Sequence, residues 1–342
     1  MTKDQWLAIR KAFPGQEKKP WTVLVWLADI ALMGAAWTLW NADALLSNLA
    51  AWLVAGFALV QLYLIMHEAT HNTVAASRFL NDVVGHGAAW FIGLPYLVRK
   101  QNHLAHHAWT AHPVHDPENR AMIAKFAVMT EKEAHRLERM WKYWIPMIAA
   151  NHFLGHWLAP FRARAAGDRS IRNRKQLLFA CVYLAGYATV FVIAWRHEAL
   201  GTLAGFYLPV WVFLLAMVEM LNLPHHAEAP ILAEDHEGLS LWEQDGVSHD
   251  CATVPLWSRF VILNFNLHIA HHLFPWLPWY RLPQASAALA AARTGSSPET
   301  LSEVVFSLRN RRRPLLSLMG HFFDRRERRG GQGIPILDAP RH

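Results

Sequence analysis

Histidines are the residues of this sequence whose type and spacing point most directly to chemistry. Eight of them form one pair and two triplets: His67 and His71; His103, His106 and His107; His268, His271 and His272. Residues three or four apart lie on one face of an α-helix, about 5–6 Å from one another. Each cluster can therefore aim two or three imidazoles at one point, and neutral imidazole is a good ligand for iron and similar transition metals.

The number of clustered histidines indicates two metal ions rather than one. The pattern H-x-x-H-H occurs twice, whereas only about 0.1 copies are expected by chance at this histidine content. A catalytic zinc usually has about three protein ligands, fewer than this set supplies. The pair His67 and His71 has the spacing of the zinc motif of metalloproteases, but that single motif is not accompanied by histidine triplets elsewhere in the chain.

Acidic residues near the clusters are candidates for orienting the metal-binding imidazoles, since such imidazoles usually donate their other N–H to a carboxylate or carbonyl. Glu68 lies inside the first cluster, and Asp116 and Glu118 follow the second. The two cysteines, Cys181 and Cys251, are isolated and provide neither a disulfide framework nor a Cys-based zinc site.

The elements that would position these residues are membrane helices. Hydrophobic residues make up 53% of the chain and charged residues 17%, against about 25% charged residues in ordinary globular proteins. Four apolar stretches are long enough to span a bilayer as helices: Trp21–Trp40, Leu46–Met66, Leu177–Trp195 and Leu200–Leu221. Short links join the first two and the last two, which predicts two helical hairpins. Two further stretches, Val83–Val98 and Trp141–Pro160, are interpreted as interfacial or half-buried helices.

The basic residues predict how these spans are oriented. With four spans, 32 of the 33 lysines and arginines lie on one side of the membrane, and only Arg196 lies opposite. The positive-inside rule assigns that side, with both termini, to the cytoplasm. The same topology gathers 20 of the 21 histidines there, His197 being the exception. The histidine clusters therefore can form one site at the cytoplasmic face.

The sequence predicts an all-α integral membrane protein with six successive parts. These are a cytoplasmic N-terminal segment (1–20), a first hairpin (21–66), a cytoplasmic cap with the first two clusters (67–176), a second hairpin (177–222), a cap with the third cluster (223–323) and a basic flexible tail (324–342).

Two other kinds of histidine-rich membrane protein are remote alternatives. A b-type haem electron carrier would use histidines near helix ends, but it needs no H-x-x-H-H triplets. A metal transporter would place its ligands inside the spans, because intramembrane polar residues mark transport paths. In the predicted spans only Asp29 and Glu219 stand out.

The clusters resemble the three histidine boxes of the membrane fatty acid desaturase and hydroxylase superfamily. The resemblance covers residues 66–283, and the third box is the most specific: Asn264–Pro275 is similar to the N-x-x-x-H-x-x-H-H-x-F-P stretch of acyl-lipid desaturases. It implies two irons held by about nine histidines, the ninth at the cytoplasmic end of the fourth span. His226, four residues after Asn222, is preferred there to His225, and Asn222 would hold a water molecule beside the metals.

The resemblance also implies an activity. It is the O2-dependent oxidation of an unactivated C–H bond in a fatty acyl lipid or free fatty acid, most often giving a double bond. The alternatives on the same scaffold are a hydroxylase and a terminal-alkene-forming decarboxylase. The first box has three intervening residues where stearoyl-CoA-type desaturases have four, which weighs against an acyl-CoA substrate of that type. No haem-binding H-P-G-G stretch is present, so the electrons are expected from a separate ferredoxin-type or similar donor. The expected partners are thus a lipid or free fatty acid substrate, an electron donor and the bilayer, and nucleic acid is not among them. The compact chain predicts that the membrane is the inner membrane of a bacterium.

Overall fold

The computed structural model describes residues 1–15, 18–40, 43–226 and 229–292. Within these ranges the regular elements are helices, and none of the described residues forms a β-strand. The predicted all-α class is therefore confirmed for this part of the chain. The predicted tail, residues 324–342, and the last part of the predicted cap, residues 293–323, lie outside the described residues.

Contacts within the chain divide it into two compact units, each of which is described by itself. The span unit comprises residues 16–101 and 148–218, and the histidine unit comprises residues 1–15, 102–147 and 219–342. Two helices, α5 (Tyr96–Ala108) and α10 (Leu200–His226), begin in the span unit and end in the histidine unit.

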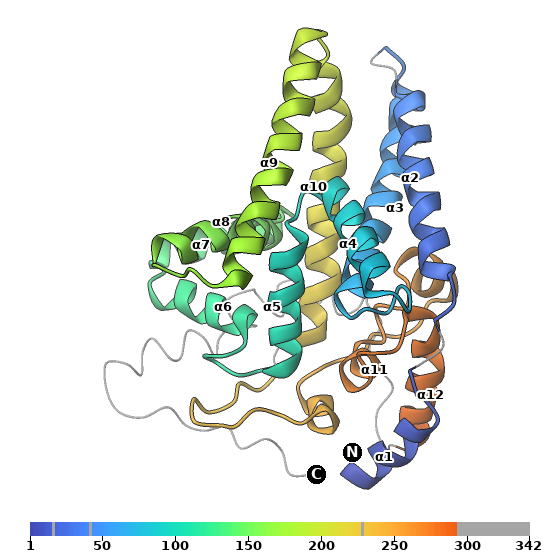
Figure 1. The fold of residues 1–342 in the computed structure, drawn as a ribbon, viewed down its shortest axis with the longest axis vertical. Helices are drawn as coiled ribbons and strands as arrows, with labels where there is room; N and C mark the ends of the chain where they lie inside the picture. The colour runs from blue at the N-terminus through green and yellow to red at the C-terminus, as the bar shows by residue number, and fades with distance from the viewer. Residues whose placement is uncertain (16–17, 41–42, 227–228, 293–342) are drawn as a thin grey trace. The chain divides into compact units, whose positions relative to one another are not determined.

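Four helices among the described residues are long and apolar enough to cross a membrane: α2 (Trp21–Leu39), α3 (Leu45–Thr70), α9 (Ile171–Arg196) and α10 (Figure 1). Each corresponds to one of the four predicted spans. Helices α2 and α3 contact each other, whereas the pairing of all four into two hairpins stays a prediction.

Two of these helices extend further than hydropathy predicts. Helix α3 continues through Thr70 instead of ending at Met66, and α10 continues through His226 instead of ending at Leu221. Hydropathy detects where apolar side chains stop, but a helix ends where its backbone hydrogen bonds stop. After α3 that point is marked by Asn72, whose φ of 56° is in the left-handed region.

Helix α3 forms the centre of the span unit. Two thirds (67%) of its most apolar stretch is buried, against 22%, 17% and 33% for α2, α9 and α10. It contacts both α2 and α4 (Arg78–Ile92). The other spans therefore leave most of their apolar surface exposed, as expected of helices that face lipid.

The two stretches interpreted as half-buried helices have different bounds in the structure. The first is divided, because Gly93 takes a φ of 75° and ends α4 before α5 begins at Tyr96. The second corresponds to α8 (Met147–Ala165), which begins later than predicted and contains Pro160. Neither α4, α5 nor α8 is among the candidate membrane spans of the described residues.

A close approach in the span unit fixes α4 against the start of α5. A Cβ atom on Gly85 would lie only 2.3 Å from the Tyr96 ring, so this position has room for glycine alone. The hydroxyl of Tyr96 donates a hydrogen bond to the carbonyl oxygen of Ala69 at 2.9 Å. Tyr96 thereby contacts the backbone of the first histidine cluster.

The histidine unit is built from short elements. They are α1 (Lys3–Lys11), the end of α5, α6 (Pro117–Ala127), α7 (Glu131–Lys142), the end of α10, η1 (Leu241–Gly246), η2 (Trp257–Val261), α11 (His268–Leu273), η3 (Trp279–Arg281) and α12 (Leu282–Ala292).

Helix α11, which carries the third histidine cluster, has only six residues and needs tertiary packing, since isolated helices of this length are unstable in water. Apolar side chains from α1 and α12 surround it in one buried cluster. The indole N–H of Trp6 donates to the Leu273 carbonyl at 3.3 Å, and its ring is stacked on Phe274. The N-terminal helix thus holds the third cluster in place.

Candidate metal centre

Helices α5 and α11 place the histidine triplets side by side in the histidine unit. The candidate ligand atoms of His103, His107 and His271 lie within 4.8 Å of one another. Those of His106, His226 and His272 form a second group with the same spread. We call these the first and second imidazole groups. Each of the two helices contributes to both groups, because adjacent histidines on a helix point in different directions.

The spacing of ring nitrogens fits ligands that share a metal ion. Nε2 of His107 lies 3.0 Å from Nε2 of His271 in the first group. Beside the second group, Nε2 of His268 lies 3.0 Å from Nε2 of His226 and 3.1 Å from Nε2 of His272. Neighbouring ligands at right angles on one ion, with metal–nitrogen bonds of about 2.1 Å, stand about 3.0 Å apart.

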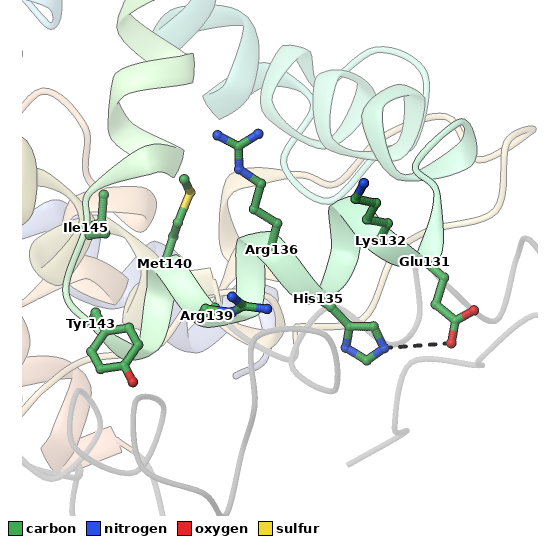
Figure 2. A pocket seen from close by; sticks show the side chains of 8 residues that line it. All are labelled: Glu131, Lys132, His135, Arg136, Arg139, Met140, Tyr143 and Ile145. Atoms are coloured by element: carbon green, nitrogen blue, oxygen red, sulfur yellow. Dashed lines mark ion pairs between the residues drawn. The ribbon is translucent and has the colours of Figure 1, made fainter.

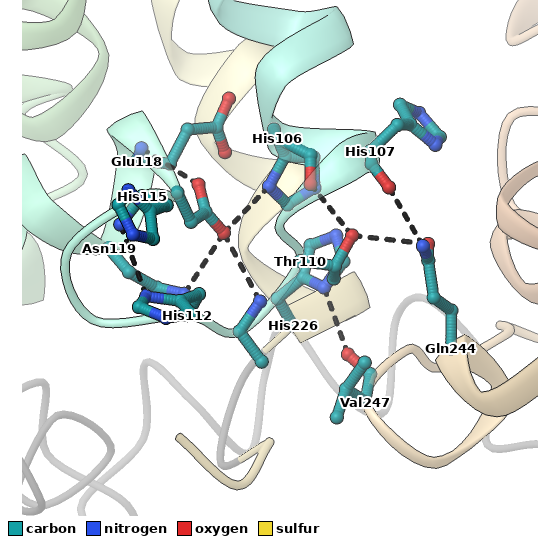
Figure 3. A network of polar contacts seen from close by, with 12 residues as sticks. His106, His107, Thr110, His112, His115, Glu118, Asn119, His226, Gln244 and Val247 are labelled. Carbon is teal, nitrogen blue, oxygen red and sulfur yellow. Dashed lines mark hydrogen bonds and ion pairs between the residues drawn. The ribbon is translucent and has the colours of Figure 1, made fainter. Parts of the chain in front are cut away.

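The opposite ring nitrogens of the second group are held by hydrogen-bond acceptors, and Figure 3 shows those of His106 and His226. Nδ1 of His106 donates to the Asp116 carboxylate at 3.0 Å, and Nδ1 of His226 donates to the Val247 carbonyl at 3.1 Å. Nδ1 of His272 donates to Oε1 of Gln244 at 2.9 Å. In a neutral imidazole with a proton on Nδ1, Nε2 carries a lone pair. The second group therefore presents lone pairs at short range, which a bound cation would stabilise.

The electrostatic setting favours neutral imidazoles. Burial lowers the pKa of His268 well below its usual range, and the neighbouring His225 and His272 lower it further. Imidazole ligands suit iron, zinc, copper and nickel. The residues present thus fit a histidine-held iron centre of the kind expected from the sequence.

Asp116 lies where an orienting carboxylate is expected. It is fully buried, and besides His106 its Oδ2 accepts from the Ala111 amide at 3.2 Å and the Asn119 side chain at 3.0 Å. Its Oδ1 accepts from the Glu118 amide at 3.0 Å, which caps the N-terminus of α6. The backbone amide of Glu118 thus helps to fix Asp116.

The first histidine pair lies in the span unit. His67 is in the last turn of α3, and His71 follows as its C-terminal cap. Their candidate ligand atoms lie within 4.8 Å of each other. Glu68 lies between them in the sequence, and its side chain is buried. Its carboxylate accepts a hydrogen bond from the Thr73 hydroxyl at 2.9 Å. Its carboxylate therefore braces the loop that follows this pair.

The two candidates for a ninth ligand differ in orientation. His226 belongs to the second imidazole group, whereas the ring of His225 is stacked on His268 with centroids 4.2 Å apart and planes 10° from parallel. The nitrogen lone pairs of imidazole lie in the ring plane. A ring stacked flat on His268 therefore does not point a lone pair at its neighbour, and His225 belongs to neither imidazole group. Asn222 is half-buried on α10, one helical turn before His226.

Other histidines near the boxes make contacts that fit structural roles. Nδ1 of His112 accepts from the amides of Val114 and His115, and its Nε2 donates to the His236 carbonyl. In the span unit Nδ1 of His156 donates to the carbonyl of His152 at 2.8 Å. None of these residues is among the metal-binding groups of the described residues.

Gln244 and Val247 contact the second group but were not predicted. Val247 acts through its backbone carbonyl, which no side-chain pattern reveals. For Gln244 a local signal existed: Ser240 and Glu243 form a capping box that starts the helical turn η1. That signal predicts a turn there, but not its contact with histidines.

The histidine unit also has a surface groove, and none of the residues that line it belongs to the two imidazole groups (Figure 2). It is lined by residues of α7 and the turn after it: Glu131, Lys132, His135, Arg136, Arg139, Met140, Tyr143 and Ile145. It contains none of the nine histidines predicted as ligands, so it is not the candidate metal centre.

Known proteins resemble this chain over most of its length. The family model described as fatty acid desaturase matches residues 44–299. The sn-1 oleoyl-lipid 12-desaturase of Anabaena variabilis is 24% identical over 302 residues, which are 82% of this chain and 79% of that protein.

Two proteins of Arabidopsis thaliana are also similar. The chloroplastic omega-6 fatty acid desaturase is 24% identical over 253 residues, 70% of this chain and 52% of that protein. The chloroplastic sn-2 acyl-lipid omega-3 desaturase (ferredoxin) is 23% identical over 317 residues, 82% of this chain and 64% of that protein. The chain thus spans about half of the first plant protein and just under two thirds of the second.

Proposed function

Because the chain belongs to the fatty acid desaturase family, we propose that it introduces a double bond into a fatty acyl chain. The reaction uses two irons, O2 and electrons from a separate donor. The observation that carries the proposal is the pair of imidazole groups, whose candidate ligand atoms lie within 4.8 Å of one another in each group. Ring nitrogens 3.0–3.1 Å apart join His107 to His271 in the first group, and His268 to His226 and His272 at the second. Two such groups in one unit match two metal ions better than one.

Nine histidines serve as the iron ligands: His67, His71, His103, His106, His107, His226, His268, His271 and His272. The geometry supports the seven that lie in the histidine unit, and the box spacing and the family support His67 and His71. When bound, the irons supply the O2-dependent oxidation of an unactivated C–H bond.

Three further residues assist the ligands. Asp116 orients His106 through the hydrogen bond to Nδ1, Glu68 braces the loop after the first box through Thr73, and Asn222 holds a water molecule one helical turn before His226. Burial of the imidazole groups keeps bulk water from the reacting carbon.

The protein lies in a membrane with both termini in the cytoplasm, and that membrane is the inner membrane of a bacterium. The orientation is supported by the 32 of 33 basic residues that four spans place on one side. The four apolar helices support the membrane location.

The substrate is a fatty acyl lipid, and the donor is a ferredoxin-type protein. The name of the Anabaena relative, an sn-1 oleoyl-lipid 12-desaturase, supports a lipid-linked acyl chain. The name of one plant relative includes ferredoxin, which supports that class of donor.

The product distinguishes this function from its alternatives. The purified protein, in nanodiscs of phospholipids with defined acyl chains, is supplied with ferredoxin, ferredoxin reductase and O2, and the lipids are analysed by mass spectrometry. We expect an acyl chain that has lost two hydrogens, and no conversion by the matched variant His272→Ala. An exclusively hydroxylated chain would replace desaturation by hydroxylation. An alkene one carbon shorter, formed when free fatty acid is supplied in place of the phospholipid, would replace it by decarboxylation.

A further inference from the structure

Gln244 is a buried side chain whose amide is used at both ends. It is 1% exposed and lies in η1. Its Oε1 accepts from Nδ1 of His272 at 2.9 Å, and its Nε2 donates to the backbone carbonyl of His107 at 2.7 Å. One residue thereby connects the second histidine box, on α5, to the third, on α11. Figure 3 shows the contact of Gln244 with His107.

The orientation of this amide follows from its partners. The His107 carbonyl is an acceptor only, so it must face the NH2 group of Gln244. A flipped amide would place two oxygens against each other at that contact. Oε1 is therefore directed at His272, whose Nδ1 must carry the proton. The carbonyl of His107 is in the last turn of α5, where helix geometry leaves carbonyls without an intrahelical partner.

The surroundings restrain the side chain further. The Thr110 hydroxyl lies 3.1 Å from Oε1 of Gln244 and 2.8 Å from the carbonyl of His106. The backbone carbonyl of Gln244 accepts from the Ser248 hydroxyl at 3.0 Å. These contacts leave the amide little freedom to turn away from His272.

We infer that Gln244 is a positioning residue of the metal centre: it sets the tautomer and ring orientation of His272 so that Nε2 faces the second imidazole group. The inference rests on the proposed iron centre. Gln244 differs from Asp116, the partner of His106, because it is neutral and also donates. A carboxylate at this position would accept from His272 but would repel the His107 carbonyl, so glutamine suits both contacts.

Three variants of the full-length protein test this role. Gln244→Met keeps the length of the side chain but removes acceptor and donor, and Gln244→Glu keeps the acceptor and adds a negative charge. Gln176→Met is the matched control, because Gln176 donates to Gln101 at 2.7 Å and this amide-to-amide contact involves no histidine.

The first measurement is the affinity for Fe2+ by anaerobic titration of the metal-free proteins. We expect Gln244→Met to bind iron about 10–100-fold more weakly than the wild type, as for other lost partners of metal-bound histidine, and the control to be unchanged. Equal affinity in Gln244→Met and the wild type would overturn the inference. A wild type that binds no iron would refute the proposed function instead.

The second measurement is the Mössbauer spectrum of 57Fe-loaded Gln244→Glu, which also decides the question if Gln244→Met does not fold. A charged partner on His272 should shift the iron signal of this spectrum relative to that of the wild type. A merely structural role for Gln244 predicts an unchanged spectrum, and that result would overturn the inference.

Discussion

The Asp116→Ala variant tests whether the buried carboxylate supports both the fold and the metal centre. Asp116 caps α6 and accepts hydrogen bonds from the buried groups His106 Nδ1 and Ala111 N–H. Loss of an N-cap costs about 1 kcal/mol, and each buried donor left without an acceptor costs about 1–3 kcal/mol. We therefore expect the free energy of unfolding of the metal-free protein to fall by about 3–7 kcal/mol.

The variant should also bind iron more weakly. Without its acceptor the His106 ring is free to rotate or to protonate Nε2, and loss of such a partner typically reduces metal affinity about 10–100-fold. Unfolding in detergent micelles with increasing denaturant gives the stability, and titration with Fe2+ gives the affinity. Asp116→Asn is the matched control: it can keep one acceptor oxygen, so it should lose less stability than Asp116→Ala. Wild-type iron affinity in Asp116→Ala would refute the assignment of Asp116 as the partner of His106.

Two pairs of variants follow from the geometry of the site and of its support. His226→Ala should lose about half of the bound iron, measured per chain by elemental analysis. His225→Phe should keep its iron, because a phenyl ring preserves the stacking on His268. The reverse pattern would make His225 the ligand. Gly85→Ala should reduce the stability by about 1–3 kcal/mol or more, because its Cβ would collide with the Tyr96 ring. Gly155→Ala on α8, where a Cβ meets nothing within 4 Å, should instead add up to about 1 kcal/mol. Equal unfolding midpoints for these two glycine variants would contradict the packing argument.

The sequence predicts the histidine groups well because their geometry is local. The spacing of His103, His106 and His107 places them on α5, and the same spacing repeats in the third box on α11. The choice of His226 comes instead from the resemblance to the family, which implies a ninth ligand near an asparagine at the end of the fourth span. The structure brings six of the predicted ligands into two groups within one unit.

The partners of these histidines are harder to predict because they come from distant parts of the chain. Gln244 contacts His107 across 137 positions of sequence, and no periodic pattern specifies such a contact. Val247 acts through a backbone carbonyl, so any residue type could occupy its position. Asp116 could be predicted only because it follows the second box closely.

The helix ends show another limit of sequence reasoning. The apolar stretch predicted as the second span stops at Met66, whereas the helix that contains it, α3, continues through the first box to Thr70. Polar side chains at the end of a span do not interrupt backbone hydrogen bonds. The continuation matters for the site, because it places His67 on the same helix as the second apolar stretch, in keeping with the helical spacing of the first pair.

Helices α5 and α11 each supply both imidazole groups, and this has a consequence for metal uptake. A rotation of α5 about its axis moves His103 and His107 together with His106, so neither group can be adjusted without disturbing the other. The first ion to bind is therefore expected to fix the orientation of both helices and to lower the entropic cost of binding the second. Loading of the wild type is expected to be cooperative, with chains that hold a single ion scarce. An inserted residue within either triplet would abolish both positions at once.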